Sequence, residues 1–214
     1  MQADRVRQGA NTVFRGWTFR ASAVSTAATI TIPAGAKVGD WAFLFDYARD
    51  TVGTPTGVTP TNWSDISGLA ATGATVARML GSQKILVSGD PGASITGMDG
   101  GSLDSKVMLV FGKYVGSVAI QDVAAEATNG NPAAQTCNAN SSSLPLVVIG
   151  ISAYLTGAGA FSTASPAFDA EVTDSARITL GYKVYNSGQA DHSIDKDDEG
   201  SANYLGSFYV EGSP

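Results

Sequence analysis

The chain has 214 residues, of which 43% are hydrophobic and only 15% are charged. Ordinary globular proteins carry roughly 25% charged residues, so this composition argues against a helical bundle, a fold that relies on Glu, Lys and Arg. The hydrophobic share also excludes wholesale disorder, and at roughly 100–200 residues per domain the length allows one large domain or two small ones.

The formal net charge of −6 is unevenly distributed. The first 20 residues contain Arg5, Arg7, Arg15 and Arg20 against a single acidic residue, Asp4, whereas the remainder of the chain is acidic. An acidic body excludes nucleic-acid binding over the whole surface, because such binding needs many Lys or Arg side chains at phosphates. The pattern favours a basic N-terminal arm on an acidic body.

Cys137 is the only cysteine, which excludes an intrachain disulfide and a cysteine-based zinc site. The N-terminus lacks the apolar segment of a signal peptide. The longest apolar run, residues 144–155, is shorter than the about 20 residues that a membrane-spanning helix needs. We therefore expect a soluble protein, made in the cytoplasm of its producing cell, with no membrane contact.

A two-residue alternation of apolar and polar side chains predicts strands along the chain. It begins at Thr29–Ile32 and stops at Pro33-Ala34-Gly35. A short strand is predicted at Lys84–Val87, before the turn-forming residues Ser88–Gly92. Further strands are predicted at residues 107–111, 115–123, 146–155, 178–184 and 205–210. The strongest signal lies at residues 41–48, where four aromatic side chains share one face: Trp41, Phe43, Phe45 and Tyr47.

These segments amount to about eight short strands between turn-forming residues, and the pattern predicts an all-β fold. We expect an antiparallel β-sandwich, jelly-roll-like in its connections. The stretch Gly68–Leu80 stays open between a helical turn and a loop, and no repeat of roughly 20–50 residues is visible. Residues 1–24 are expected to be an N-terminal arm or edge strand, and residues 25–214 a single β-sandwich domain.

The alternation also identifies a candidate core. Residues 146–155 are apolar on both faces, as expected of a central strand. The side chains that we expect to be mostly buried are Trp41, Phe43, Phe45, Leu109, Phe111, Val148, Ile149, Ile151, Leu180 and Tyr182.

Residues suited to catalysis are scarce. His192 is the only histidine, and no nucleophile elbow, P-loop or dinucleotide-binding motif is present. Ser193–Lys196 matches Ser-x-x-Lys, but it lies in what we expect to be a solvated polar loop. The acidic run Asp191–Gly200 lacks the spacing of an EF-hand, so a mobile acidic loop is favoured over a loose Ca²⁺ site. We therefore expect no enzyme activity, and no catalytic, cofactor-binding or metal-binding residues.

The aromatic residues near the N-terminus suggest an interface. Aromatic and Arg side chains anchor protein–protein contacts, so the arm is a candidate docking strip; the alternative is that it forms the first strand of its own sheet. Trp63, in a loop after Pro60, could instead stack on a sugar, which makes a glycan a further candidate ligand. The proposed interface residues are Arg5, Arg7, Phe14, Arg15, Trp17, Phe19 and Arg20.

The segment Thr29–Leu44 resembles the opening of β-sandwich modules in tailed-phage virion proteins. In those modules an apolar strand ends in Pro-Ala-Gly, here residues 33–35, and a Gly-Asp pair, here residues 39–40, starts a second apolar strand. A Pro and a loop Trp follow, here Pro60 and Trp63, and the opening Asp4–Gln8 also looks like the start of phage head or tail accessory proteins.

The resemblance implies a non-enzymatic structural subunit located in the virion, on the head, neck or tail. It also implies a homo-oligomer that contacts other virion proteins, without disulfides and assembled in a reducing cytoplasm. The alternative is a carbohydrate-binding module or a receptor-binding tail component.

Overall fold

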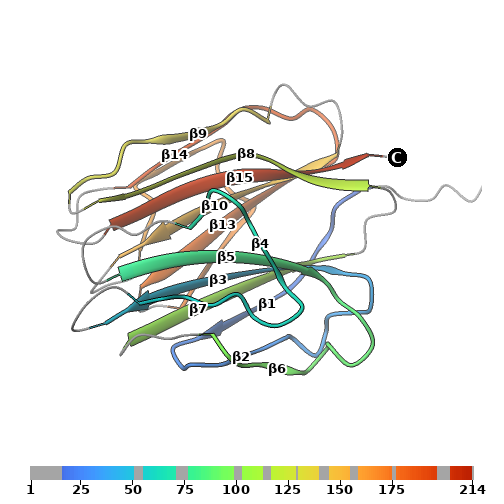
Figure 1. Ribbon diagram of the computed structural model, residues 1–214. Helices are drawn as coiled ribbons and strands as arrows, with labels where there is room; N and C mark the ends of the chain where they lie inside the picture. The colour runs from blue at the N-terminus through green and yellow to red at the C-terminus, as the bar shows by residue number, and fades with distance from the viewer. Residues whose placement is uncertain are drawn as a thin grey trace, which may run out of the picture.

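The computed structural model describes residues 16–50, 55–70, 77–98, 103–112, 117–128, 130–139, 145–154, 159–174, 177–196 and 203–213. Within these ranges every regular element is a β-strand, and most strands belong to two five-stranded antiparallel sheets (Figure 1). The all-β class and the sandwich expected from the sequence are confirmed, whereas the jelly-roll connection stays a prediction.

The first large sheet comes from the N-terminal half of the chain. Its strand order is β1-β7-β3-β5-β4, so β3 lies at the centre. The strands are β1 (Phe19–Ser25), β3 (Trp41–Arg49), β4 (Ser64–Asp65), β5 (Ala77–Ile85) and β7 (Leu103–Phe111).

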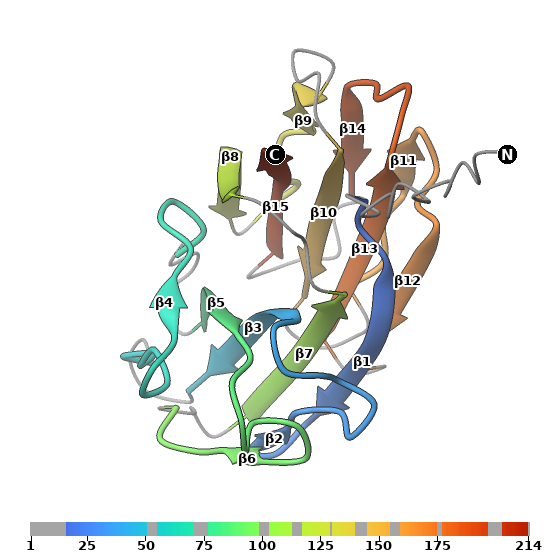
Figure 2. The ribbon, with the colours of Figure 1, turned by 90° about the vertical axis from the view of Figure 1, so that its right-hand side faces the viewer.

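The second large sheet comes from the C-terminal half and has the order β12-β13-β10-β15-β8. The two sheets face each other, with β1 near β12 at one side of the sandwich and β4 near β8 at the other (Figure 2). The strands are β8 (Ser117–Thr128), β10 (Leu146–Ala153), β12 (Ala170–Thr173), β13 (Ile178–Tyr185) and β15 (Asn203–Ser213).

Two small sheets cover the outer faces. β2 (Ile30–Thr31) pairs with β6 (Ser94–Ile95), and the apolar side chains around them pack on the outer face of the first sheet. β14 (His192–Asp195) pairs with β9 (Gln135–Cys137) and β11 (Thr163–Ser165). Cys137 of β9 packs on the outer face of the second sheet, so both faces of each large sheet are largely buried.

The main core lies between the inner faces of the two large sheets. The side chains of Phe43 and Phe208, from opposite sheets, have ring centroids 6.1 Å apart. Nine of the ten side chains predicted to form the core are buried, and the tenth, Trp41, is partly exposed. Trp41 is the first residue of β3, at the end of the strand, and its side chain is only partly covered.

The described residues form fifteen strands rather than about eight, and two local predictions also differ from the structure. β5 begins at Ala77 rather than at Lys84. The polar residues in this strand interrupt the apolar alternation from which a strand is predicted. They can lie inside a strand because β3 and β4 flank β5 on its two sides. The stretch 68–80, for which the sequence allows a helical turn or a loop, is therefore strand from Ala77 onward. Residues 192–195 are strand β14 rather than a solvated loop, and both His192 and Ile194 are buried.

The two large sheets share one strand plan. If β1, β7, β3, β5 and β4 are replaced in that order by β8, β15, β10, β13 and β12, each strand occupies the same sheet position and the same place along its half of the chain. The β2–β6 and β9–β14 pairs also fall at corresponding places between the large strands. Each half of the chain therefore contributes one large sheet and its cover.

The pairing registers agree with this plan. Phe43 of β3 lies opposite Gln83 of β5, and Ile149 of β10 lies opposite Tyr182 of β13. The edge pairings β1–β7 and β8–β15 each contain a register shift of the β-bulge type. Gln83 and Tyr182 therefore hold equivalent positions in the two halves.

Few residues are identical at equivalent positions of the two halves. Gly89 and Gly188 have positive φ angles of 91° and 64°, so the turn after β5 and the turn after β13 both use a conformation that favours glycine. The repeated unit is half of the chain, far longer than the roughly 20–50 residues of common repeats. The residues around these turns that recur with the same spacing are Lys84, Ser88-Gly89 and Ser94-Ile95 in the first half, and Lys183, Ser187-Gly188 and Ser193-Ile194 in the second.

Truncating Phe43 to alanine should lower the free energy of unfolding by about 3–5 kcal/mol, because this side chain is fully buried between the sheets. Denaturant melts of the wild type and the variant measure the loss. Val38→Ala is the control, since Val38 is 61% exposed and should change stability by less than about 0.5 kcal/mol. A loss below about 1 kcal/mol for Phe43→Ala would contradict the packing described.

Candidate functional site

The N-terminal residues proposed as a docking strip are only partly described. Trp17 is 1% exposed and lies in the core of its own sandwich, and Phe19 stacks on Tyr182 with ring centroids 4.5 Å apart. Arg20 pairs with the Asp40 carboxylate at 2.5 Å. The prediction that Trp17 and Phe19 form an exposed strip is therefore wrong, because the Trp17 ring is buried in the chain's own core and the Phe19 ring is partly buried against that core. The other four residues of the strip, Arg5, Arg7, Phe14 and Arg15, lie outside the described residues.

The first part of the acidic run Asp191–Gly200 contains buried side chains, whereas the sequence predicts a solvated loop. Lys196 is buried, and its ammonium lies 5.1 Å from the centre of the Tyr154 ring. Residues 197–200 lie outside the described part of the chain. Among the residues that the structure describes, no three His, Cys, Asp or Glu side chains converge in a way that could hold a metal ion.

The only histidine and the only cysteine are cross-strand neighbours. His192 of β14 pairs with Cys137 of β9, and both side chains are fully buried. Burial raises the pKa of the Cys137 thiol, with a further contribution from Asp122. Burial and the nearby Lys183 ammonium lower the pKa of His192 to about 4. A nucleophilic cysteine needs a thiolate, so this neutral pair is suited to packing rather than to nucleophilic chemistry.

A second buried polar cluster lies on the outer face of the first sheet. The Lys106 ammonium is 3.1 Å from Asp46 Oδ1 and 3.2 Å from Asp104 Oδ2. Burial raises the pKa of Asp46 to about 6, and Lys106 opposes that rise. Asp46 and Lys106 are direct cross-strand partners in β3 and β7, so this ion pair favours the observed register of the two strands.

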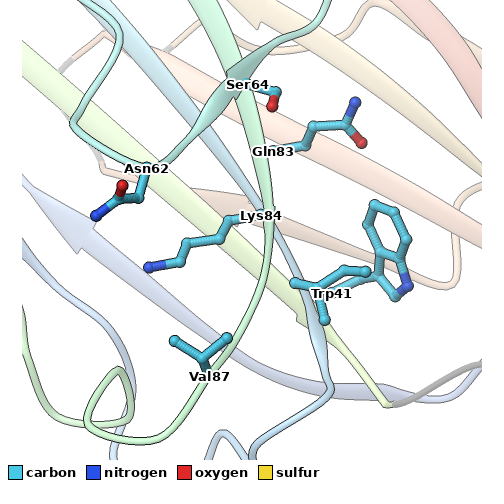
Figure 3. A pocket seen from close by; sticks show the side chains of 7 residues that line it. Trp41, Asn62, Ser64, Gln83, Lys84 and Val87 are labelled. Carbon is cyan, nitrogen blue, oxygen red and sulfur yellow. The ribbon is translucent and has the colours of Figure 1, made fainter.

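An open groove of about 530 Å³ lies beside β5, at the end of the first sheet. Such a volume falls within the range of small-ligand sites. Trp41 and Gln83 lie on one side of β5, whereas Lys84 and Asn62 lie on the other (Figure 3). The lining residues are Trp41, Asn62, Ser64, Gln83, Lys84, Ile85 and Val87.

The groove forms because β5 and its continuation extend past the end of β4. β4 pairs only with Gln83 and Ser82, so the residues that follow in β5 have no β4 neighbour. Ile85 and Val87 remain 48% and 54% exposed at this uncovered edge. Large apolar side chains that are half exposed beside a half-buried Trp ring are typical of a binding surface.

The polar side chains of the groove are held in place. The Lys84 ammonium pairs with Asp90 Oδ1 at 2.8 Å, and the Val87 amide donates to Asp90 Oδ2 at 2.6 Å. Asn62 has a φ of 65°, a left-handed conformation that Asn tolerates better than most residues. This conformation occurs in the turn closed by the Trp63 amide and the Pro60 carbonyl at 3.0 Å, directly before β4.

A smaller hollow of about 250 Å³ adjoins the groove and shares Asn62 and Lys84 with it. Its lining includes the half-buried Trp63, the loop aromatic for which the sequence suggested sugar stacking. Sequence reasoning did not find the groove itself. The only signal was the Ser88–Gly92 turn that follows the exposed end of β5.

No family model matches the chain, and no curated protein or solved structure is detectably similar to it. In the described residues no helix has the length and apolar character needed to span a membrane. The candidate functions of the groove and of the hollow therefore rest on their own chemistry.

The pKa of His192 should make part of the stability depend on pH. Because the folded-state pKa is lower than the ordinary 6.5, the unfolded chain takes up a proton that the folded chain refuses. This contribution to stability is therefore present above about pH 6.5 and falls as the pH drops toward 4, by about 3 kcal/mol in total. Asp46, with its raised pKa, acts in the opposite direction, so the His192 effect is isolated by comparing the wild type with His192→Phe.

The titration can be observed directly, since the chain has one histidine. The imidazole proton shifts in NMR spectra should move with a midpoint near pH 4 in the folded protein. A midpoint near the ordinary value of 6.5 would show that His192 is solvated and would contradict its placement.

Proposed function

We propose that this protein is a non-enzymatic structural subunit of a tailed-phage virion, present in several copies on the head, neck or tail. The segment Thr29–Leu44 carries the proposal, because its sequence resembles the opening of β-sandwich modules in such particles. In the structure this segment is β2, a turn in which the Ala36 amide donates to the Pro33 carbonyl at 2.9 Å, and the start of β3. The residues that carry the resemblance therefore serve folding rather than chemistry.

The chemistry of the buried groups supports a non-enzymatic role. The pair best suited in principle to nucleophilic catalysis is Cys137 and His192. Both residues belong to the small sheet that covers the outer face of the second large sheet, and both side chains are fully buried. A substrate could reach neither without local unfolding.

The closed build of the sandwich suits a subunit that folds on its own before it enters a particle. The small sheets cover the outer faces of the large ones, which removes broad apolar surfaces, and stability does not depend on disulfides. The interface hypothesis is now restricted to Arg5, Arg7, Phe14 and Arg15. In sequence, three arginines and one aromatic residue within residues 5–15 would suit an acidic partner surface.

The proposal is tested on purified particles of a phage whose genome encodes this chain. Quantitative mass spectrometry of density-gradient particles should find the protein at several copies per particle, and antibodies against the recombinant chain should label intact particles in electron micrographs. Its absence from infectious, washed particles would contradict the proposal.

A second candidate function, carbohydrate binding, is favoured by the hollow that Trp63 helps to line. An indole ring next to the Asn62 amide and the Asp90 carboxylate offers the stacking surface and the hydrogen-bonding groups that a sugar needs. In this case the protein would be a glycan-binding or receptor-binding component.

A glycan array probed with the full chain tests this second candidate. Binding to a defined oligosaccharide should fall at least about tenfold in Trp63→Ala, because the stacking surface is lost. Val24→Ala is the control, since Val24 is 48% exposed on β1 and lies outside the hollow. An array without binding, or binding that Trp63→Ala leaves unchanged, would exclude the hollow as a sugar site.

A further inference from the structure

The buried cluster of Lys106, Asp46 and Asp104 on the outer face of the first sheet places one amine between two carboxyl groups. Lys106 is 0% exposed, and the two aspartates are almost as deeply buried. The Lys106 ammonium lies 3.1 Å from Asp46 Oδ1 and 3.2 Å from Asp104 Oδ2, but within the described residues it makes no hydrogen bond with suitable angles. Neither contact is therefore a well-formed ion pair, although both carboxyl groups are within reach of the amine.

The surroundings of the cluster are apolar. Leu44 and Met108, the next residues on the same face of β3 and β7, are buried in one apolar cluster with residues of β2 and β6. Leu80 of β5 lies opposite Asp46 and is also buried. Such surroundings disfavour charged side chains, and burial raises the pKa of Asp46 to about 6. The uncharged form of the pair, an amine beside a carboxylic acid, consists of a nucleophile and a carbonyl carbon that it can attack.

The sheet itself does not require these charges. In the second half of the chain, the pair equivalent to Asp46 and Lys106 is Ser152 and Leu205, which are also cross-strand partners and fully buried. Asn203, two residues before Leu205, takes the place of the third residue of the cluster. Replacing a buried ion pair by uncharged residues is often neutral or stabilising, because the charges no longer have to leave water. Packing and stability alone therefore do not account for the cluster.

We propose that Lys106 Nζ and Asp46 Cγ form an isopeptide bond that covalently joins β7 to β3, with Asp104 transferring the proton (Figure 2). β3 is the central strand of the first sheet and β7 is its neighbour, so the bond would lock the middle of the sheet. Because the two linked residues are distant in sequence, the cross-link would also restrict the unfolded chain. The inference does not depend on a virion location.

The reaction uses only the three side chains. Transfer of a proton from the Lys106 ammonium to the Asp46 carboxylate gives the neutral amine and the carboxylic acid. The amine nitrogen then bonds to Asp46 Cγ, and Asp104 accepts the proton that this nitrogen releases. Asp104 passes the proton to the hydroxyl group of the former acid, whose C–O bond breaks as water leaves. One ammonium and one carboxylate thus become one amide and one water, so atoms and charge balance.

The buried position favours this reaction in two ways. Groups held in contact react as if at effective concentrations of up to about 10⁵–10⁸ M, which offsets the low reactivity of a carboxylic acid toward an amine. Exclusion of bulk water protects the product from hydrolysis. By contrast, the Lys183 ammonium lies even closer to a carboxylate, 2.8 Å from Asp169 Oδ1, but these side chains are 26% and 36% exposed. We expect that solvated pair to remain ionic.

Intact mass spectrometry of the full-length protein, denatured after purification, tests the proposal. The mass should be lower than the sequence mass by one water, with allowance for removal of Met1. Trypsin should not cleave after the acylated Lys106, so the peptide 85–113 should be joined to the peptide 38–49, which contains Asp46. Protein at its full sequence mass, or loss of water from peptide 85–113 without a link to peptide 38–49, would overturn the proposal.

Three variants test the role of each group. Lys106→Arg keeps the positive charge but removes the nucleophile, so it should have its full sequence mass. Asp104→Asn should slow the reaction at least about a hundredfold and be isolated mainly unlinked, because proton transfer is lost. Lys183→Arg is the matched control and should remain lighter by one water.

Circular dichroism verifies that each variant is folded, and the wild-type mass decides the proposal even where a variant fails to fold. Loss of water that persists in Lys106→Arg, or that disappears in a folded Lys183→Arg, would assign the modification to other residues and overturn the proposal. Complete linkage in Asp104→Asn would overturn the role given to Asp104.

Discussion

The contact between the inner faces of the two large sheets is the interaction on which the rest of the structure depends. Phe43 lies at its centre, with its ring 6.1 Å from those of both Phe111 and Phe208. The same ring stacks with Trp41 at 6.3 Å, which fixes the indole at the end of β3. The position of the groove wall therefore follows from packing in the core, and a groove built on rigid strands presents its ligand contacts with little loss of conformational entropy.

The shared strand plan explains why the halves need each other. Each contributes a sheet whose outer face is covered by its own small sheet, while its inner face is apolar and can be buried only against the other half. The halves differ at the sides of the sandwich. Tyr182 stacks with Phe19 at one side, whereas Gln83, at the position equivalent to Tyr182, lines the open groove at the other.

Alternation of side chains predicted the parts of the fold in which one face of a strand is apolar. Residues 41–48 are the clearest case, and they form the central strand β3. The continuous apolar run within residues 146–155, rather than alternation, predicted the other central strand, β10. Alternation could not predict β14, because its polar residues resemble a loop until its pairing with β9 is known, nor could it bring His192 beside Cys137. The groove was also beyond prediction, since it arises from the different lengths of β4 and β5, a property of two strands that are distant in sequence.

An exposed strand edge beside apolar side chains is a hazard, because it can pair with the edge of another copy and continue the sheet. The structure limits this hazard at β5. Lys84 and Asp90 form an ion pair beside the exposed residues, and the chain turns away at Gly89 directly after them. Charges and a tight turn leave only a short length of backbone available around Ile85. Such an edge is too short to extend a sheet, so a ligand of the groove must be selected mainly by the side chains that line it.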